Sequence, residues 1–109
     1  MIESGSQLLL DARMKRARLP ELPTGSRPAT PQEGYLCQAR VAERLLAHLG
    51  GRVIGYKIAC TNAIAQEFLS MPEPFHGRLF SATTYDSPAR LNAGDFFMRI
   101  IESEFAFQF

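Results

Sequence analysis

The sequence has little net charge, few cysteines and no long apolar run. Twelve basic and eleven acidic side chains give its 109 residues a formal net charge of +1. Such a balance gives no electrostatic argument for a nucleic acid or an anionic membrane as a partner. The leucines at 8–10 are far too few to span a bilayer. Because no basic leader precedes an apolar stretch and a cleavage site, we expect no export.

The two cysteines, Cys37 and Cys60, are too few for a disulfide framework. Neither has a second cysteine or a histidine at the spacing of a zinc finger. We therefore expect a reducing, cytoplasmic compartment, and we interpret Cys60 as a small buried apolar residue rather than a nucleophile. The apolar fraction of 46% and the charged fraction of 21% are those of an ordinary globular chain and do not indicate disorder.

A first helix is expected over residues 6–17, where neither proline nor glycine interrupts the chain, and it should end before Pro20. Four basic residues gather at 13–18 near its end. We interpret this basic cluster as a solvated helix face, with a nucleic-acid patch as the alternative. The proline-rich segment 19–28 that follows favours extended and turn conformations, so it is expected to be a connector.

A second helix has the clearest start signal in the sequence. Thr30 can serve as its N-cap, Pro31 suits its first position, and Glu33 can reach back to the cap. Apolar residues recur at helical spacing from Tyr35 onward, and the two glycines at 50–51 predict the end of the helix.

The segment 52–59 is short and rich in β-branched residues, which predicts a strand. Ile54, Tyr56 and Ile58 share one face of this strand, and we expect that face to be the core. Lys57 lies on the opposite face among small residues. Its ammonium either projects into a crevice or reaches solvent along the surface, and the residues alone leave both options open.

Shorter elements are expected between this strand and the C-terminal stretch. Thr61 or Asn62 can cap a short helix that runs through Leu69, with Ile64, Phe68 and Leu69 turned inward. A short strand is expected at 78–80, loops at 71–77 and 81–90, and a turn at 92–95.

The stretch 100–109 alternates in polarity over its second half. Phenylalanines occupy every other position from 105 to 109 on one face, while Glu102 and Glu104 lie on the other, which predicts a half-buried strand. Two carboxylates on one face repel each other unless positive charge lies between them, and a hard cation such as Mg²⁺ suits that role. The alternative is a solvent-facing strand with two ordinary glutamates.

Three runs occur in an order that resembles the 2-keto-4-pentenoate hydratase group of the fumarylacetoacetate hydrolase superfamily. They are Gly-Tyr-Lys-Ile-Ala-Cys-Thr at 55–61, Pro-Phe-His-Gly-Arg-Leu at 74–79 and Ile-Glu-Ser-Glu-Phe-Ala-Phe at 101–107. The helical region that includes Arg27-Pro28-Ala29-Thr30 also resembles that group, so the resemblance covers nearly the whole chain. It implies an α+β fold in which a helical lead-in region, 1–50, precedes the start of a mixed β-sandwich roll, 51–109. Because the complete roll needs roughly twice as many residues, we expect that the chain is either a fragment or completed by another chain.

The resemblance also implies a set of site residues. Glu102 and Glu104 match the paired carboxylates that hold Mg²⁺ or Mn²⁺ in the complete protein, together with a third acidic ligand that has no counterpart in this sequence. Lys57 matches a catalytic lysine that holds the substrate carboxylate or stabilises an enolate. The matched runs place Lys57, Thr61, Gly77 and Leu79 as substrate-binding residues.

The sequence departs from the family pattern at Phe75, where pentenoate hydratases of this group often have an acidic residue. His76 can replace it as a general acid or base, because imidazole titrates near neutrality, and the alternative is a polar surface histidine.

The function implied by the resemblance is metal-dependent hydration of a 2-hydroxy-2,4-dienoate, or 2-keto-4-pentenoate, in aromatic degradation. The expected partners are a 2-oxo or 2-hydroxydienoic acid substrate and other copies of the chain in a homo-oligomer, with no nucleic acid and no membrane. Two alternatives remain open. One is a non-catalytic assembly module that pairs through an open strand edge, and the other is an incomplete gene product without an independent function.

Overall fold

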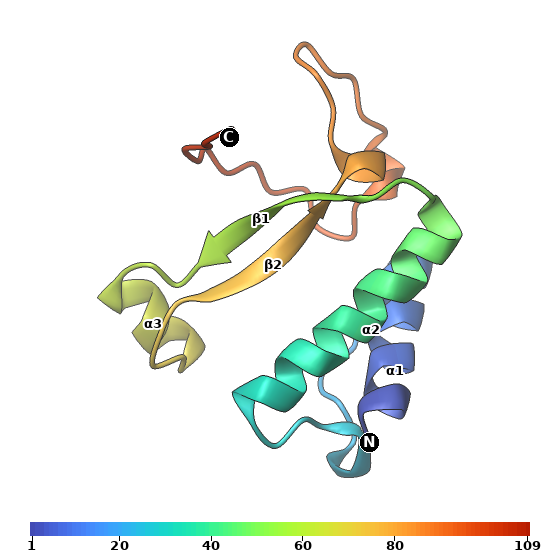
Figure 1. The fold of residues 1–109 in the computed structure, drawn as a ribbon, viewed down its shortest axis with the longest axis vertical. Coiled ribbons are helices and arrows are strands. Elements are labelled where there is room, and N and C mark those ends of the chain that lie inside the picture. The colour runs from blue at the N-terminus through green and yellow to red at the C-terminus, as the bar shows by residue number, and fades with distance from the viewer.

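Two long helices and a two-stranded antiparallel sheet form a small α+β domain (Figure 1). The structure is a computed structural model that describes all residues, 1–109. No helix combines the length and the apolar character needed to cross a bilayer. The elements in chain order are α1 (Ile2–Lys15), α2 (Pro31–Leu49), β1 (Val53–Ala59), α3 (Ala63–Leu69) and β2 (Phe75–Phe80), with short 3-10 helices at Thr24–Ser26, Ser81–Thr83 and Ala93–Asp95.

The predicted start and end of α2 are confirmed. The hydroxyl oxygen of Thr30 accepts a hydrogen bond from the backbone N–H of Glu33 at 3.2 Å. The Glu33 carboxylate in turn accepts from the N–H of Ala29 at 2.7 Å, one residue before the cap. Gly50 and Gly51 end the helix at φ angles of 72° and 80°, which glycine adopts without a steric penalty.

The core lies where α1 crosses α2 and where the end of β2 meets both helices. It is a small cluster of Leu10, Ala42, Leu45 and Phe80, with partly buried apolar neighbours from α2 and β1. At Gly5, α1 lies close to the 3-10 helix at Thr24–Ser26, because a side chain there would overlap the carbonyl oxygen of Ser26. Only eight of 109 residues are buried, so this core is thin.

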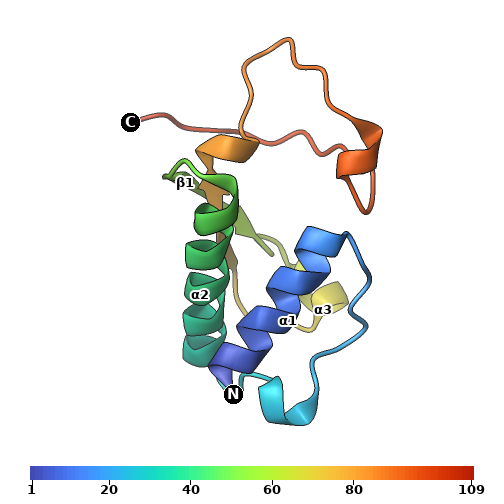
Figure 2. The same cartoon turned by 90° about the vertical axis from the view of Figure 1, so that its right-hand side faces the viewer.

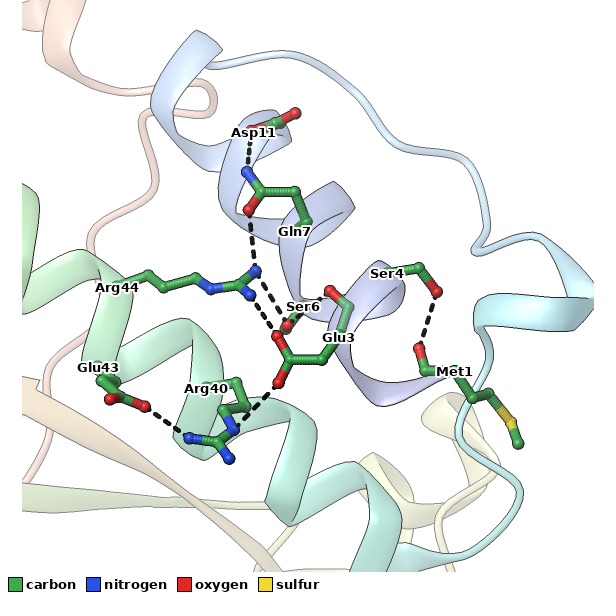
Figure 3. A network of polar contacts seen from close by, with 9 residues as sticks. All are labelled: Met1, Glu3, Ser4, Ser6, Gln7, Asp11, Arg40, Glu43 and Arg44. Atoms are coloured by element: carbon green, nitrogen blue, oxygen red, sulfur yellow. Dashed lines mark hydrogen bonds and ion pairs between the residues drawn. The ribbon is translucent and has the colours of Figure 1, made fainter.

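A polar network at the surface joins the same two helices (Figure 3). Glu3 of α1 pairs with Arg40 at 3.2 Å and also with Arg44, both on α2. The Arg44 guanidinium donates to Gln7 at 2.9 Å and to the fully buried Ser6 hydroxyl at 3.3 Å. These contacts fix how α1 lies across α2 and satisfy the one buried polar side chain at the crossing.

The sheet lies against α2 through β2. The side-chain amide of Gln38 donates to the carbonyl of His76 at 2.8 Å, and Arg78 donates to the Gln38 side chain at 2.7 Å. The predicted core face of β1 is wrong, since Tyr56 is 62% and Ile58 61% exposed. The reason is that α2 packs on β2, and β1 lies further out in the sheet (Figure 1).

Two other expectations of burial are also wrong. Asn62, one of the two predicted caps, caps the short helix α3, and its Oδ1 accepts from the N–H of Ala65 at 2.9 Å. Ile64, Phe68 and Leu69 are nevertheless exposed. The stretch 100–109 forms no strand, and Phe105 is fully exposed. A strand needs a neighbouring backbone to bond to, and the only strand pairing in the structure is between β1 and β2.

The chain exposes an unusually large surface for its size. Its accessible area is 9075 Å², whereas a compact monomer of this mass exposes about 6,000 Å². The radius of gyration is 15.0 Å, compared with about 13 Å for a compact domain of this length. Much apolar surface of β1, α3 and the C-terminal segment is therefore left uncovered.

Candidate functional site

Lys57 and two glutamates that are distant in the sequence come together in the structure. Lys57 lies in the second half of β1, and its ammonium is 3.4 Å from Glu104 Oε1 and 3.8 Å from Glu102 Oε2. Both glutamates belong to the C-terminal segment, which is red-brown in Figure 1, and the two ion pairs bring this segment to the lysine of β1. Three residues predicted to share a site thus form one cluster.

The sheet register places two more predicted residues beside this lysine. Gly77 is the β2 partner of Lys57, and a Cβ at Gly77 would lie 3.8 Å from the Lys57 Cγ. Because Gly77 has no side chain, the lysine stem has room beside β2. Leu79 is two residues further along β2, so it lies on the same face as Gly77.

His76 and Thr61 lie elsewhere. Alternation along β2 turns His76 to the face opposite Gly77, where its ring stacks on Tyr35 of α2 with the centroids 4.5 Å apart. Tyr56 meets the same imidazole edge-on at 5.7 Å. Thr61 lies beyond the end of β1, in the exposed turn before α3. The structure therefore brings neither residue to the side of the sheet that holds Lys57.

The cluster is electrostatically weak, because all three charged groups are about half exposed. Each of its ion pairs contributes on the order of 0.2–1 kcal/mol at such exposure. Both carboxylates nevertheless stabilise a positive charge at the position of the ammonium. We define Lys57, Glu102 and Glu104 as the carboxylate–lysine cluster.

The donor set of this cluster fits a hard divalent cation in part. Mg²⁺ is commonly held by one or two carboxylates and keeps several water ligands. Glu102 and Glu104 supply two such carboxylates, and the structure has no group of three or more His, Cys, Asp or Glu residues arranged to hold a metal. Two carboxylates are enough to anchor a metal that takes its other ligands from water or substrate.

Sequence reasoning missed the direct contact between the lysine and the carboxylates. Positions 57 and 104 are 47 residues apart, and no local pattern connects them. It also missed a cavity of about 620 Å³ between the end of α1 and the segment 83–98. The aromatic residues of that segment, Tyr85, Phe96 and Phe97, were the available signal, because such residues are unusual in a purely solvent-exposed loop.

No protein-family model, no curated protein and no solved structure matches this chain. Its likeness to the hydratase group therefore depends on sequence patterns alone.

Proposed function

We propose that this chain provides part of a metal-dependent, hydratase-like site for 2-oxo and 2-hydroxydienoic acids. In this proposal, residues 51–109 belong to the start of a mixed β-sandwich roll, and residues 1–50 are its helical lead-in. The observation that supports it most directly is the carboxylate–lysine cluster, in which Lys57 meets both Glu102 and Glu104. Three residues that the sequence runs single out for one site thus lie together, although the C-terminal stretch forms no strand.

The proposed roles follow from the chemistry of the side chains. Glu102 and Glu104 hold Mg²⁺ or Mn²⁺, whose Lewis acidity would polarise the 2-oxo group of a bound substrate. Lys57 attracts the substrate carboxylate or stabilises negative charge that develops next to it. Gly77 leaves room beside the lysine, and Leu79 offers an apolar contact on the same face.

Isothermal titration with Mg²⁺ and Mn²⁺ tests the proposed ligands. Binding should be lost when Glu102→Gln and Glu104→Gln are combined. The matched control combines Glu67→Gln and Glu73→Gln, which removes the same charge from two exposed glutamates that form no ion pair. Metal binding that survives the first double variant, or that is lost equally in both, would sink the ligand assignment.

The substrate class is tested separately by titrating the Mn²⁺-loaded chain with 2-oxopentanoate. Pentanoate, which lacks the 2-oxo group, is the control ligand. We expect 2-oxopentanoate to bind and pentanoate not to bind, and we expect the Lys57→Met variant to bind 2-oxopentanoate more weakly. Equal affinity for both acids would contradict recognition of the 2-oxo group, even if the metal binds as proposed.

A second candidate function is supported by the large exposed surface. The excess of about 3,000 Å² over a compact monomer is larger than the roughly 1,000–2,500 Å² that each partner buries at an obligate interface, so the chain exposes enough surface for one. β1 has an unpaired edge, so the chain is suited to an assembly module that pairs through this edge. Light scattering coupled to size exclusion decides: a monomer with a cooperative unfolding transition argues against obligate pairing.

A further inference from the structure

The end of α1 and the segment 83–98 line an open, solvent-accessible cavity that the proposed function does not use. In Figure 2 this segment arches beyond the C-terminal end of α1. The cavity has a volume of about 620 Å³, which lies within the range of about 300–1,000 Å³ for small-molecule sites. Seven of its eleven lining residues are hydrophobic, and they include Tyr85, Leu91 and Phe97.

The charge around this cavity is positive. Arg13 and Arg16 of the basic cluster line it, together with Asp95. Arg16 pairs with Asp95 at 3.1 Å, which holds the end of α1 to the segment and neutralises both charges. Arg13 forms no ion pair, so its guanidinium is the uncompensated charge of the lining.

The negative end of the α1 dipole does not cancel this positive charge. The carbonyls of Ala12 and Arg13 accept hydrogen bonds from the N–H groups of Ala17 and Arg16, at 2.9 and 3.2 Å. These last carbonyls are therefore satisfied within the chain. The full charge of Arg13 also exceeds the partial charge of about half an electron at a helix end.

We propose that this cavity binds a small aromatic carboxylate. The aromatic ring lies against Tyr85, Leu91 and Phe97, and the carboxylate pairs with the Arg13 guanidinium. The aromatic and aliphatic side chains supply apolar contact, and a planar guanidinium matches the two oxygens of a carboxylate. This explains why a basic cluster lies beside exposed aromatic residues, which the interpretation of a solvated helix face does not.

The test uses 2-naphthoate as the probe, measured by its fluorescence anisotropy during titration with the whole chain. Arg13→Gln should raise the dissociation constant about fivefold, the effect of one partly exposed ion pair. Arg18→Gln is the matched control, because it removes the same charge from a residue outside the lining. Leu91→Ser removes an apolar wall and should also weaken binding. Circular dichroism of each variant verifies that the helices remain.

The proposal also predicts selectivity. The neutral analogue 2-naphthylmethanol should bind more weakly than 2-naphthoate to the unmodified chain. Because the alcohol makes no ion pair, the Arg13→Gln variant should bind it as tightly as the unmodified chain does. Three results would overturn the proposal: equal effects of Arg13→Gln and Arg18→Gln, equal affinity of the unmodified chain for the alcohol and the acid, or no effect of Leu91→Ser. Because the cavity uses no residue of the carboxylate–lysine cluster, Glu102→Gln with Glu104→Gln should leave 2-naphthoate binding unchanged.

Discussion

Replacing Lys57 by methionine should tighten the binding of Mg²⁺ and Mn²⁺. In the structure the ammonium lies 3.4 Å from one carboxylate and 3.8 Å from the other, so it occupies the position of the proposed metal ion. A divalent cation must either break these ion pairs or bind next to the positive charge of the ammonium, and either one weakens its binding. Methionine has a similar length without the charge, so the variant removes both effects.

The size of the effect follows from the exposure of the cluster. In water, two unit charges at these separations attract with about 1 kcal/mol, and measured exposed pairs contribute about 0.2–1 kcal/mol each. Because the three groups are about half exposed, we take about 1 kcal/mol for the two pairs together. This energy corresponds to a dissociation constant about fivefold lower for the metal.

Isothermal titration of the two variants Lys57→Met and Lys15→Met measures this difference. Lys15, the other lysine of the chain, lies in the last turn of α1 and forms no ion pair, so its replacement changes the net charge equally. The affinity should rise in Lys57→Met alone and should approach that of the control as salt is added. Equal affinities in the two variants at low salt would refute the view that Lys57 competes with the metal.

Three further outcomes concern stability. Leu45→Ala should lower the free energy of unfolding by about 2–5 kcal/mol, because Leu45 is only 2% exposed and belongs to the small core cluster. Urea titration measures this loss, and a loss under about 1 kcal/mol would contradict the assigned core. Thr30→Ala should cost about 1 kcal/mol in the same assay, through loss of the cap on α2, whereas Thr30→Ser should cost little. Burial raises the pKa of the Cys37 thiol above its usual value of 9.0. Above about pH 9 the folded state therefore keeps a thiol proton that the unfolded state releases. Stability should therefore be full at lower pH and decline as the pH rises above about 9, and Cys37→Ala should remove this part of the decline in urea titrations across that range.

Local signals in the sequence predicted local structure well. The capping pattern at Thr30 and the glycines after Leu49 depend on atoms within one helical turn, so both ends of α2 could be predicted. For the same reason, the sequence narrowed the cap of α3 to Thr61 or Asn62, and the structure uses Asn62. The β1 strand was also expected, from its β-branched residues.

Burial and pairing could not be read in the same way. Alternation along β1 indicates two faces but not which face a helix covers, and α2 packs on β2 instead. Likewise, the alternating polarity around Phe105 and Phe107 indicates a strand only where another strand is available, and none pairs with this segment. Both errors concern contacts between distant parts of the chain.

The candidate site shows the same division. The sequence singled out Lys57, Glu102 and Glu104 through their resemblance to the hydratase group, and the structure brings these three together. It also singled out His76, which strand alternation turns toward Tyr35 on the other face of the sheet. A motif thus selected side chains of suitable chemistry, while the strand register decided which of them can meet.

Paramagnetic broadening by Mn²⁺ tests the central claim most directly. In ¹⁵N-labelled protein, substoichiometric Mn²⁺ should first broaden the amide signals of the proposed ligands, Glu102 and Glu104, and of Lys57 and Gly77 beside them. The same broadening should be absent when Glu102→Gln and Glu104→Gln are combined. Broadening that is strongest at other acidic residues, or that persists unchanged in the double variant, would contradict a metal site at the carboxylate–lysine cluster.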